Sequence, residues 1–171
     1  TITLIVSNPS GSDTLAQTVS FTPGNSPVLA ACIPQTLNMC CGFGIYNVSF
    51  NTINKSSGDA TESYRDFICS DNTQIYTNET YQLSVQTNPD TGTMQKLKVW
   101  IDYNNDGTFD EVTELVFVKD SIISAVSGDI TIPADSMVVL NALLRMRVSS
   151  DAQNAGLFTS CTDVLFSQVE D

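Results

Sequence analysis

Apolar and polar residues alternate along this chain in short runs, and a two-residue period is typical of strands with one buried face. Clusters of Gly, Asn, Asp and Pro separate the runs, and no run has the period of a helix longer than a turn or two. The pattern therefore predicts many short strands packed as a β-sandwich. We expect them at residues 2–6, 15–21, 45–53, 64–68, 81–85, 97–101, 115–118, 122–126, 129–132, 143–148 and 164–169.

The first strands form a unit of their own. Residues 1–22 are interpreted as a hairpin that turns at residues 8–13, and residues 23–31 as a linker that opens with Pro and Gly. A two-stranded hairpin alone is marginally stable in water, so it needs a partner. We expect that partner to be the rest of its own domain, the domain that follows, or a neighbouring subunit whose sheet the hairpin completes.

Composition supports this fold class. The chain has 171 residues and is 42% apolar, which is enough to build a core for one domain. Helix formers are sparse, while Thr, Val, Ile, Tyr and Phe are plentiful. We predict an all-β fold: a jelly-roll or immunoglobulin-like antiparallel sandwich, preceded by the N-terminal hairpin.

The charged residues and the missing histidine exclude several functions. A net charge of −12, with no cluster of Lys or Arg, opposes binding to nucleic acid. The absence of histidine excludes Ser-His-Asp and Cys-His catalysis and histidine-ligated zinc. The longest apolar stretch, at residues 137–144, is too short to span a bilayer, and no signal peptide is present, so we expect a mature or excised fragment.

The strongest chemical signal is an acidic loop that follows the strand at residues 97–101. Side-chain oxygens recur there at every second position, and Gly107 permits a sharp reversal of the chain. Oxygen ligands at this spacing suit a hard cation, and Ca²⁺ is the first candidate. The proposed ligands are Asp102, Asn104, Asp106, Thr108, Asp110 and Glu114.

The last ligand of this loop is open. Thr113 stands where an EF-hand loop has glutamate, and Glu114 is one place late. The final ligand is therefore Glu114, a water molecule, or Glu170 or Asp171 brought back by the fold. The alternative is an Asx-rich β-turn that binds no ion.

Two of the three arginines, Arg145 and Arg147, lie on one face of the strand predicted at residues 143–148. We expect them to form a structural ion pair with Glu170 and Asp171, which ties the last strand to its neighbour. The alternative is two exposed arginines on an edge strand. Trp100, the only tryptophan, is either a platform for stacking a sugar or a core residue on the second face of its strand.

The five cysteines are Cys32, Cys40, Cys41, Cys69 and Cys161. No Cys-x-x-Cys pair occurs, which argues against a zinc or redox motif. In an extracellular chain they form two disulfides with one cysteine left over, and their spacing does not define the connectivity.

Taken together, several segments resemble the GEVED domain over residues 32–171. They are Gly44-Ile-Tyr-Asn-Val-Ser-Phe, Val99-Trp-Ile-Asp-Tyr-Asn-Asn-Asp-Gly107, Leu144-Arg-Met-Arg-Val148 and the closing Ser167-Gln-Val-Glu-Asp171. The hairpin at residues 1–22 is similar to the closing strands of a PKD-like domain. The GEVED resemblance implies a pairing of Cys32 with Cys161, which leaves Cys69 to pair with Cys40 or Cys41.

The resemblance also implies a non-catalytic module of large secreted proteins on the bacterial cell surface. The leading hypothesis is a calcium-stabilised structural or adhesion module of a surface protein or extracellular filament, whose partners are neighbouring domains or subunits. Assembly by strand complementation is its sharper form. The alternative is a carbohydrate-binding accessory module of a secreted enzyme such as a protease, with glycans as partners of Trp100.

Overall fold

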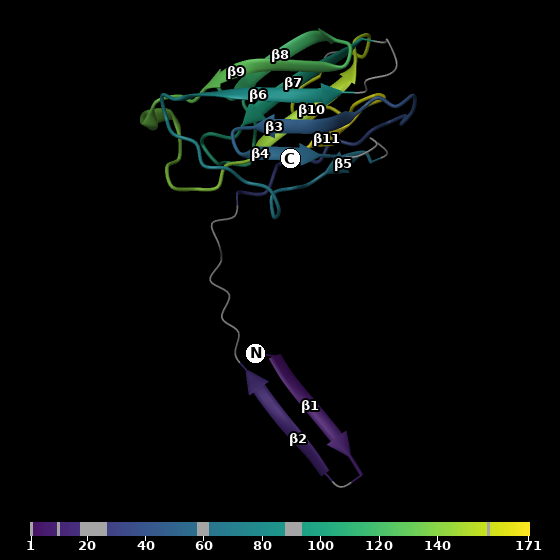
Figure 1. The fold of residues 1–171 in the computed structure, drawn as a ribbon, viewed down its shortest axis with the longest axis vertical. Coiled ribbons are helices and arrows are strands. Elements are labelled where there is room, and N and C mark those ends of the chain that lie inside the picture. The colour runs from purple at the N-terminus through teal and green to yellow at the C-terminus, as the bar shows by residue number, and fades with distance from the viewer. Residues whose placement is uncertain (1, 10, 18–26, 58–61, 88–93, 157) are drawn as a thin grey trace.

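Strands β3 to β11 form two sheets that pack face to face, and a two-stranded hairpin, β1–β2, stands apart from them (Figure 1). The computed structural model describes residues 2–9, 11–17, 27–57, 62–87, 94–156 and 158–171. Within these ranges the chain is all-β, and its single short helical turn is the 3₁₀ segment Asp135–Met137. The prediction of an all-β sandwich is therefore confirmed.

The larger sheet carries the residues that matter most below. Its strand order is β5-β11-β10-β7-β8, and all pairs are antiparallel except β11 with β5, which run parallel. The predicted fully antiparallel sandwich is wrong at this one pair. The strands are β5 (Tyr64–Arg65), β11 (Val169–Glu170), β10 (Met146–Ala152), β7 (Gln95–Ile101) and β8 (Leu115–Ile122).

The smaller sheet has the order β4-β3-β6-β9, and every pair in it is antiparallel. Its strands are β4 (Ile53–Ser56), β3 (Ile45–Phe50), β6 (Thr80–Thr87) and β9 (Ala125–Thr131). The β8–β9 connection joins the two sheets along one side of the sandwich (Figure 1). On the opposite side, β4 of the smaller sheet is followed along the chain by β5 of the larger sheet, so the chain also passes between the sheets there.

The core lies between the two sheets. Leu97 and Val99 of β7 belong to the same buried cluster as Val48 of β3 and Leu83 of β6. The sequence predicts a half-buried β7, but the strand is buried on both faces, because Trp100 packs with two phenylalanines from loops on the reverse side. Alternation along one strand does not reveal that loops cover its second face.

Several strand boundaries differ from the sequence prediction. Residues 45–53 divide into β3 and β4 around a turn in which Asn51 has a positive φ of 51°. The three strands expected between residues 115 and 132 are two, β8 and β9. At the end of the chain, Val164 makes only an isolated bridge to Thr36, and the strand there is β11.

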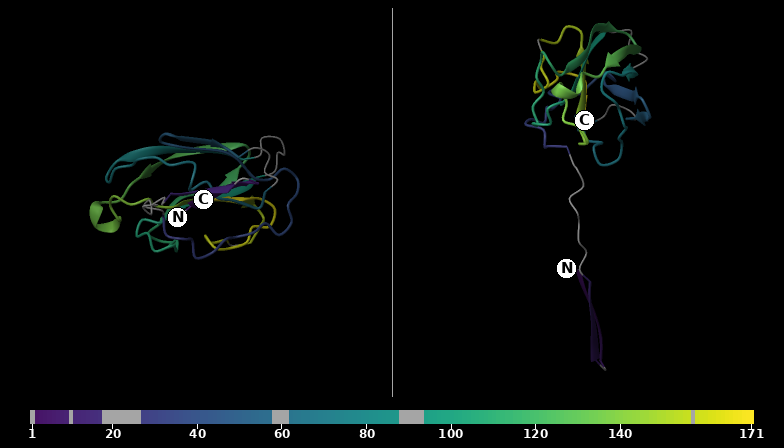
Figure 2. Two further views of the ribbon diagram at one scale, coloured as in Figure 1. Left: turned by 90° about the horizontal axis from the view of Figure 1, so that it is seen from below. Right: turned by 90° about the vertical axis from the view of Figure 1, so that its left-hand side faces the viewer.

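The hairpin consists of β1 (Ile2–Asn8) and β2 (Gly11–Gln17), paired antiparallel with Asn8 opposite Gly11 (Figures 1 and 2). The hairpin agrees with the prediction, but the turn is shorter than the predicted residues 8–13, because β2 already begins at Gly11. Residues 18–21 of the predicted second strand and residues 23–26 of the predicted linker lie outside the described residues. Pro27 is buried, and residues 28–31 contact the sandwich, as shown below.

Candidate functional site

The acidic loop begins at the end of β7, where Asp102 is completely buried. Its Oδ2 accepts a hydrogen bond from the Gly107 amide at 2.9 Å, and its Oδ1 accepts one from the Asp106 amide at 3.1 Å. Burial raises the pKa of this carboxyl, although the two amides oppose the shift. Gly107 has a φ of 85°, a conformation that suits glycine and closes the loop.

The exposed part of the loop is a series of Asx turns. The Asn104 Oδ1 accepts the Asp106 amide at 2.9 Å, and the Asp106 Oδ1 accepts the Thr108 amide at 2.7 Å. The Asp110 Oδ1 accepts the Thr113 amide at 2.7 Å. Hydrogen bonds from the Thr108 side chain and amide lower the pKa of Asp106, and those from the following amides lower the pKa of Asp110. These hydrogen bonds thus favour the charged forms of Asp106 and Asp110.

The side chain of Glu114 points into the middle of the same loop. Its side chain is 2% exposed, and its Oε1 and Oε2 accept the amides of Asn104 at 3.2 Å and of Asp110 at 2.8 Å. Of the candidates for a last ligand, Glu114 is therefore the one that the fold places in the loop. Among the described residues, however, no three Asp, Glu or Cys side chains form a group close enough to hold a metal.

The loop also holds the chain that enters the sandwich from the N-terminal side. The Ala31 amide donates to the Gly107 carbonyl at 2.7 Å, and the Val28 amide donates to the Asn105 side chain at 3.1 Å. The Val28 carbonyl in turn accepts a bond from Arg145 at 3.4 Å. Residues 28–31, expected to be part of a linker, are thus attached to the loop. Asn105 was not among the predicted site residues, and nothing in its sequence position indicates this contact.

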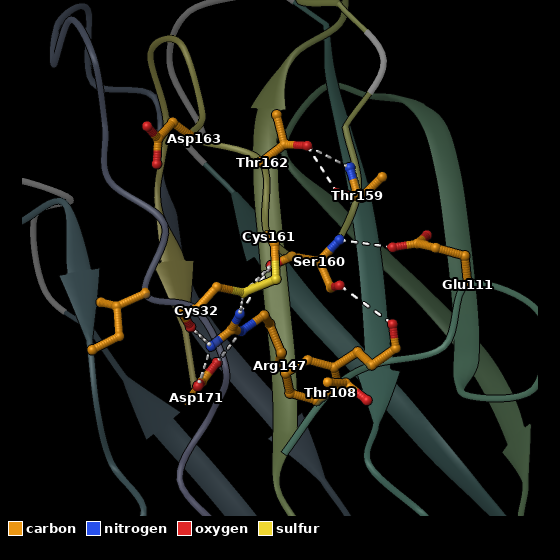
Figure 3. Close-up of a disulfide and its surroundings, with 12 residues drawn as sticks. Cys32, Thr108, Glu111, Arg147, Thr159, Ser160, Cys161, Thr162, Asp163 and Asp171 are labelled. Carbon is orange, nitrogen blue, oxygen red and sulfur yellow. Dashed lines mark hydrogen bonds and ion pairs between the residues drawn. A yellow bond between two sulfur atoms is a disulfide. The ribbon is translucent and has the colours of Figure 1, made fainter. Parts of the chain in front are cut away.

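Arg147 lies at the centre of a second set of contacts, adjacent to the first (Figure 3). It forms a bidentate pair with Asp171, with both the Nε–Oδ1 and Nη2–Oδ2 distances at 2.6 Å. It also donates to the carbonyls of Cys32 at 3.1 Å and Ser160 at 2.9 Å. The guanidinium carbon lies 4.7 Å from the centre of the Phe109 ring. Arg147 therefore joins the start of the sandwich to its last strand.

Arg145 supports the same carboxylate, with 3.1 Å between its Nη1 and the Asp171 Oδ2. Arg145 is 2% exposed and Arg147 is fully buried, which rules out the alternative of two exposed arginines. The predicted partner Glu170 is wrong for either arginine. Successive residues of a strand point to opposite faces, so Glu170 of β11 faces the interior of the sandwich and Asp171 faces the arginines.

The structure pairs Cys32 with Cys161, with 5.6 Å between their Cα atoms (Figure 3). Cys40 forms a disulfide with its neighbour Cys41, and Cys69 is free and exposed. The expected pairing of Cys69 with Cys40 or Cys41 is therefore wrong. Adjacent cysteines can react without any long-range approach of the chain, whereas Cys69 sits in the turn that follows β5.

Trp100 is fully buried, in a cluster with Phe109 and Phe158. The Lys98 ammonium lies over the Trp100 ring, 5.9 Å from the ring centre. The ring therefore has no exposed face on which a sugar could stack, and its position agrees with the core interpretation.

One connected unit is formed by β7, the acidic loop, the two arginines near β10 and the carboxylate of Asp171. The order of these features along the chain can be compared with known families. Residues 96–171 match the GEVED domain. This domain is a non-catalytic module of surface proteins. No curated protein and no solved structure matches the chain.

The GEVED match covers the acidic loop, both arginines and Asp171, but not all of the sandwich. β3, β4, β5 and β6, with Cys32, precede the matched residues. The match also gives no support for a PKD-like segment at residues 1–22. Two disulfides together with the match to the GEVED domain point to an extracellular protein. No helix in the described ranges is long and apolar enough to cross a membrane.

Proposed function

We propose that this chain is an extracellular structural module of a larger secreted surface protein or fibre. The observation that carries the proposal is the position of Arg147, which binds the Cys32 carbonyl and the Asp171 carboxylate at once. The segment that enters the sandwich and the strand that closes it therefore meet at one buried guanidinium. Such a joint suits a module whose work is to hold its neighbours at a fixed spacing and direction.

We further propose that the acidic loop stiffens this joint by binding Ca²⁺ through Asp102, Asn104, Asp106, Asp110 and Glu114, with the backbone carbonyl of Thr108. Two carboxylates of the loop, Asp102 and Glu114, are buried, and no ion pair joins Asp102, Asp106 or Glu114 to a Lys or Arg among the described residues. A hard cation with oxygen ligands would supply the missing positive charge. Because residues 28–31 bind the same loop, the ion would also stabilise their attachment.

Thermal unfolding in Ca²⁺ and in excess EGTA tests the metal. Saturating Ca²⁺ should add about 3–4 kcal/mol to the free energy of unfolding by mass action and raise the Tm accordingly. Asp106→Asn should remove most of this increase, whereas the exposed Asp120→Asn on β8 should retain it. Equal melting temperatures in Ca²⁺ and EGTA for the unaltered chain would show that the loop is an Asx-rich turn without an ion.

For the hairpin, we propose that β1–β2 completes the sheet of a neighbouring domain or subunit. In the described part of the chain, β1 and β2 pair only with each other, which leaves an edge of each strand open and supports this. The experiment is deletion of residues 1–22 from the full-length parent protein, followed by measurement of its assembly at the cell surface. Loss of assembly with an unchanged melting temperature of the sandwich is expected. Normal assembly of the deletion variant would end the proposal.

A further inference from the structure

A cleft of about 640 Å³ opens between the two sheets on the side away from the β8–β9 connection. One wall comes from the smaller sheet, with Val48 and Phe50 of β3, and the other from the larger sheet, with Ile101 and Val148. Residues from the loops at 67–77 and 138–145 form much of the remaining lining. A space of this size and apolar character is typical of sites for small organic ligands.

One buried acidic side chain of the cleft carries an oxygen without a hydrogen-bond partner among the described residues. Glu170 of β11 lines the cleft and is 3% exposed. Its Oε1 atom is buried and has no hydrogen-bond partner in the described part of the chain. A buried acceptor without a donor is costly, so such an atom in a cavity indicates a position for a donor from a ligand.

The cations near Glu170 are already engaged elsewhere. Lys55 of β4 pairs with Asp71 at 2.9 Å, and Arg65 of β5 pairs with Glu62 at 2.5 Å. Arg145, which also lines the cleft, pairs with Asp171. Burial raises the pKa of Glu170 to about 7, against the opposing effects of Ser57, Arg65 and Lys55. Among the described residues, no Lys or Arg thus forms an ion pair with this carboxyl.

The mouth of the cleft is apolar and open. Tyr76 is 60% exposed, Leu140 is 51% exposed and Leu143 is 41% exposed, and all three line the cleft. Leu140 and Leu143 belong to the longest apolar stretch of the sequence, which no part of the proposed structural role uses. Tyr76, Leu140 and Leu143 therefore give an apolar chain a surface to pack against at the mouth of the cleft.

We propose that this cleft is a binding site for a small amphiphilic primary amine, whose apolar chain packs between the sheets and whose ammonium group donates to the Glu170 Oε1. A carboxylate ligand would meet Glu170 and a chain of net charge −12, so an anionic head group is disfavoured. A cationic head group gains both the free acceptor and the carboxylate charge. The site does not include the acidic loop, although Arg145 and Asp171 of the structural joint line part of it.

Isothermal titration calorimetry with three eight-carbon probes tests the site: n-octylammonium, 1-octanol and octanoate. The unaltered protein should bind n-octylammonium at least tenfold more tightly than 1-octanol, and octanoate should not bind. Glu170→Gln should abolish the preference for the ammonium probe. Glu79→Gln, which removes an exposed carboxylate outside the cleft, should preserve it.

Ala142→Trp tests the location of the probe. Ala142 lines the cleft and is half-buried, so an indole at this position should fill the mouth and weaken binding of n-octylammonium at least tenfold. Thermal unfolding checks that each variant is folded before it is titrated. If Ala142→Trp does not fold, the test rests on Glu170→Gln. Equal binding of the ammonium and alcohol probes, unchanged binding by Glu170→Gln, or no binding of any probe would overturn the proposal.

Discussion

Arg147 and Asp171 face each other inside the protein as a bidentate ion pair, with side chains that are both completely shielded from solvent. Removing one member of a buried pair leaves an uncompensated charge, which typically costs about 3–5 kcal/mol. We therefore expect Arg147→Met and Asp171→Asn each to lower the free energy of unfolding by about that amount. Urea titration measures both.

A double-mutant cycle with Arg147→Met and Asp171→Asn separates the pair from its surroundings. The double variant should lose less than the sum of the two single variants, because the second substitution removes a charge that the first leaves unpaired. Lys55→Met is the matched control, since Lys55 and Asp71 form a partly exposed pair whose loss should cost less than about 1 kcal/mol. Strict additivity of the two buried substitutions would contradict the pairing.

The two disulfides should differ sharply in their effect on stability. The Cys32–Cys161 bond closes a sequence separation of 129 residues, and a crosslink of that length restricts the unfolded chain by about 4–5 kcal/mol in the chain-entropy estimate. Cys32→Ala with Cys161→Ala should lower the Tm strongly. Cys40→Ser with Cys41→Ser removes a bond with a separation of 1 residue and should change the Tm little. Peptide mapping by mass spectrometry checks both pairings directly, and a Cys69 crosslink to Cys40 or Cys41 would contradict the structure.

Gly107 is required both by its backbone and by its neighbour. It has a φ of 85°, and a Cβ at this position would lie 2.4 Å from the Leu29 carbonyl oxygen. Gly107→Ala should therefore separate residues 28–31 from the loop and cost about 1–3 kcal/mol, as strained backbone positions do. Gly156→Ala is the control, because a Cβ there meets no atom within 4 Å. Thermal unfolding compares the two, and equal Tm values for both variants would show that the contact with Leu29 is unimportant.

Glu170 should make stability fall as pH rises across the neutral range. Burial raises its pKa from the ordinary value of 4.5 to about 7 in the folded protein, so the folded state holds the proton more tightly. Stability due to this group is fully present below pH 4.5 and is lost as pH rises through about 7. At 1.36 kcal/mol per pKa unit, the loss is about 3 kcal/mol.

Glu170→Gln isolates that contribution, because glutamine does not titrate. The difference in the free energy of unfolding between Glu170→Gln and the unaltered protein should grow in favour of the variant between pH 4.5 and 7. Urea unfolding at several pH values measures the difference, from which all other titrating groups cancel. A difference independent of pH would show that the Glu170 carboxyl titrates normally in the fold.

How far the sequence predicts this structure depends on the range of the interaction. Alternating residues and turn clusters are local, and they correctly identify β3, β6, β7 and most of β8 and β9 as extended. The burial of Trp100 depends on Phe158, far along the chain, and no local pattern reports it. The free thiol of Cys69 likewise follows from long-range geometry, since spacing alone permits several pairings.

The ion pair shows a different limit. The sequence places Arg145 and Arg147 on one face and offers both Glu170 and Asp171 as partners. Because side chains alternate along a strand, only one of two consecutive residues can reach that face. The choice between Glu170 and Asp171 could therefore have been predicted from the sequence in principle. The position of Glu170 in a cleft could not be predicted in this way, because the cleft is lined by residues of two separate sheets.

The Cys32–Cys161 bond also sets how far the chain can lengthen under tension. If a surface fibre is pulled through this module, the residues between these two cysteines are shielded from the load by the covalent link. At about 3.3–3.6 Å per extended residue, the separation of 129 residues corresponds to roughly 450 Å of contour length that the pull does not release. Under oxidising conditions the module therefore behaves as a link of nearly constant length, and reduction of one bond converts it into an extensible one.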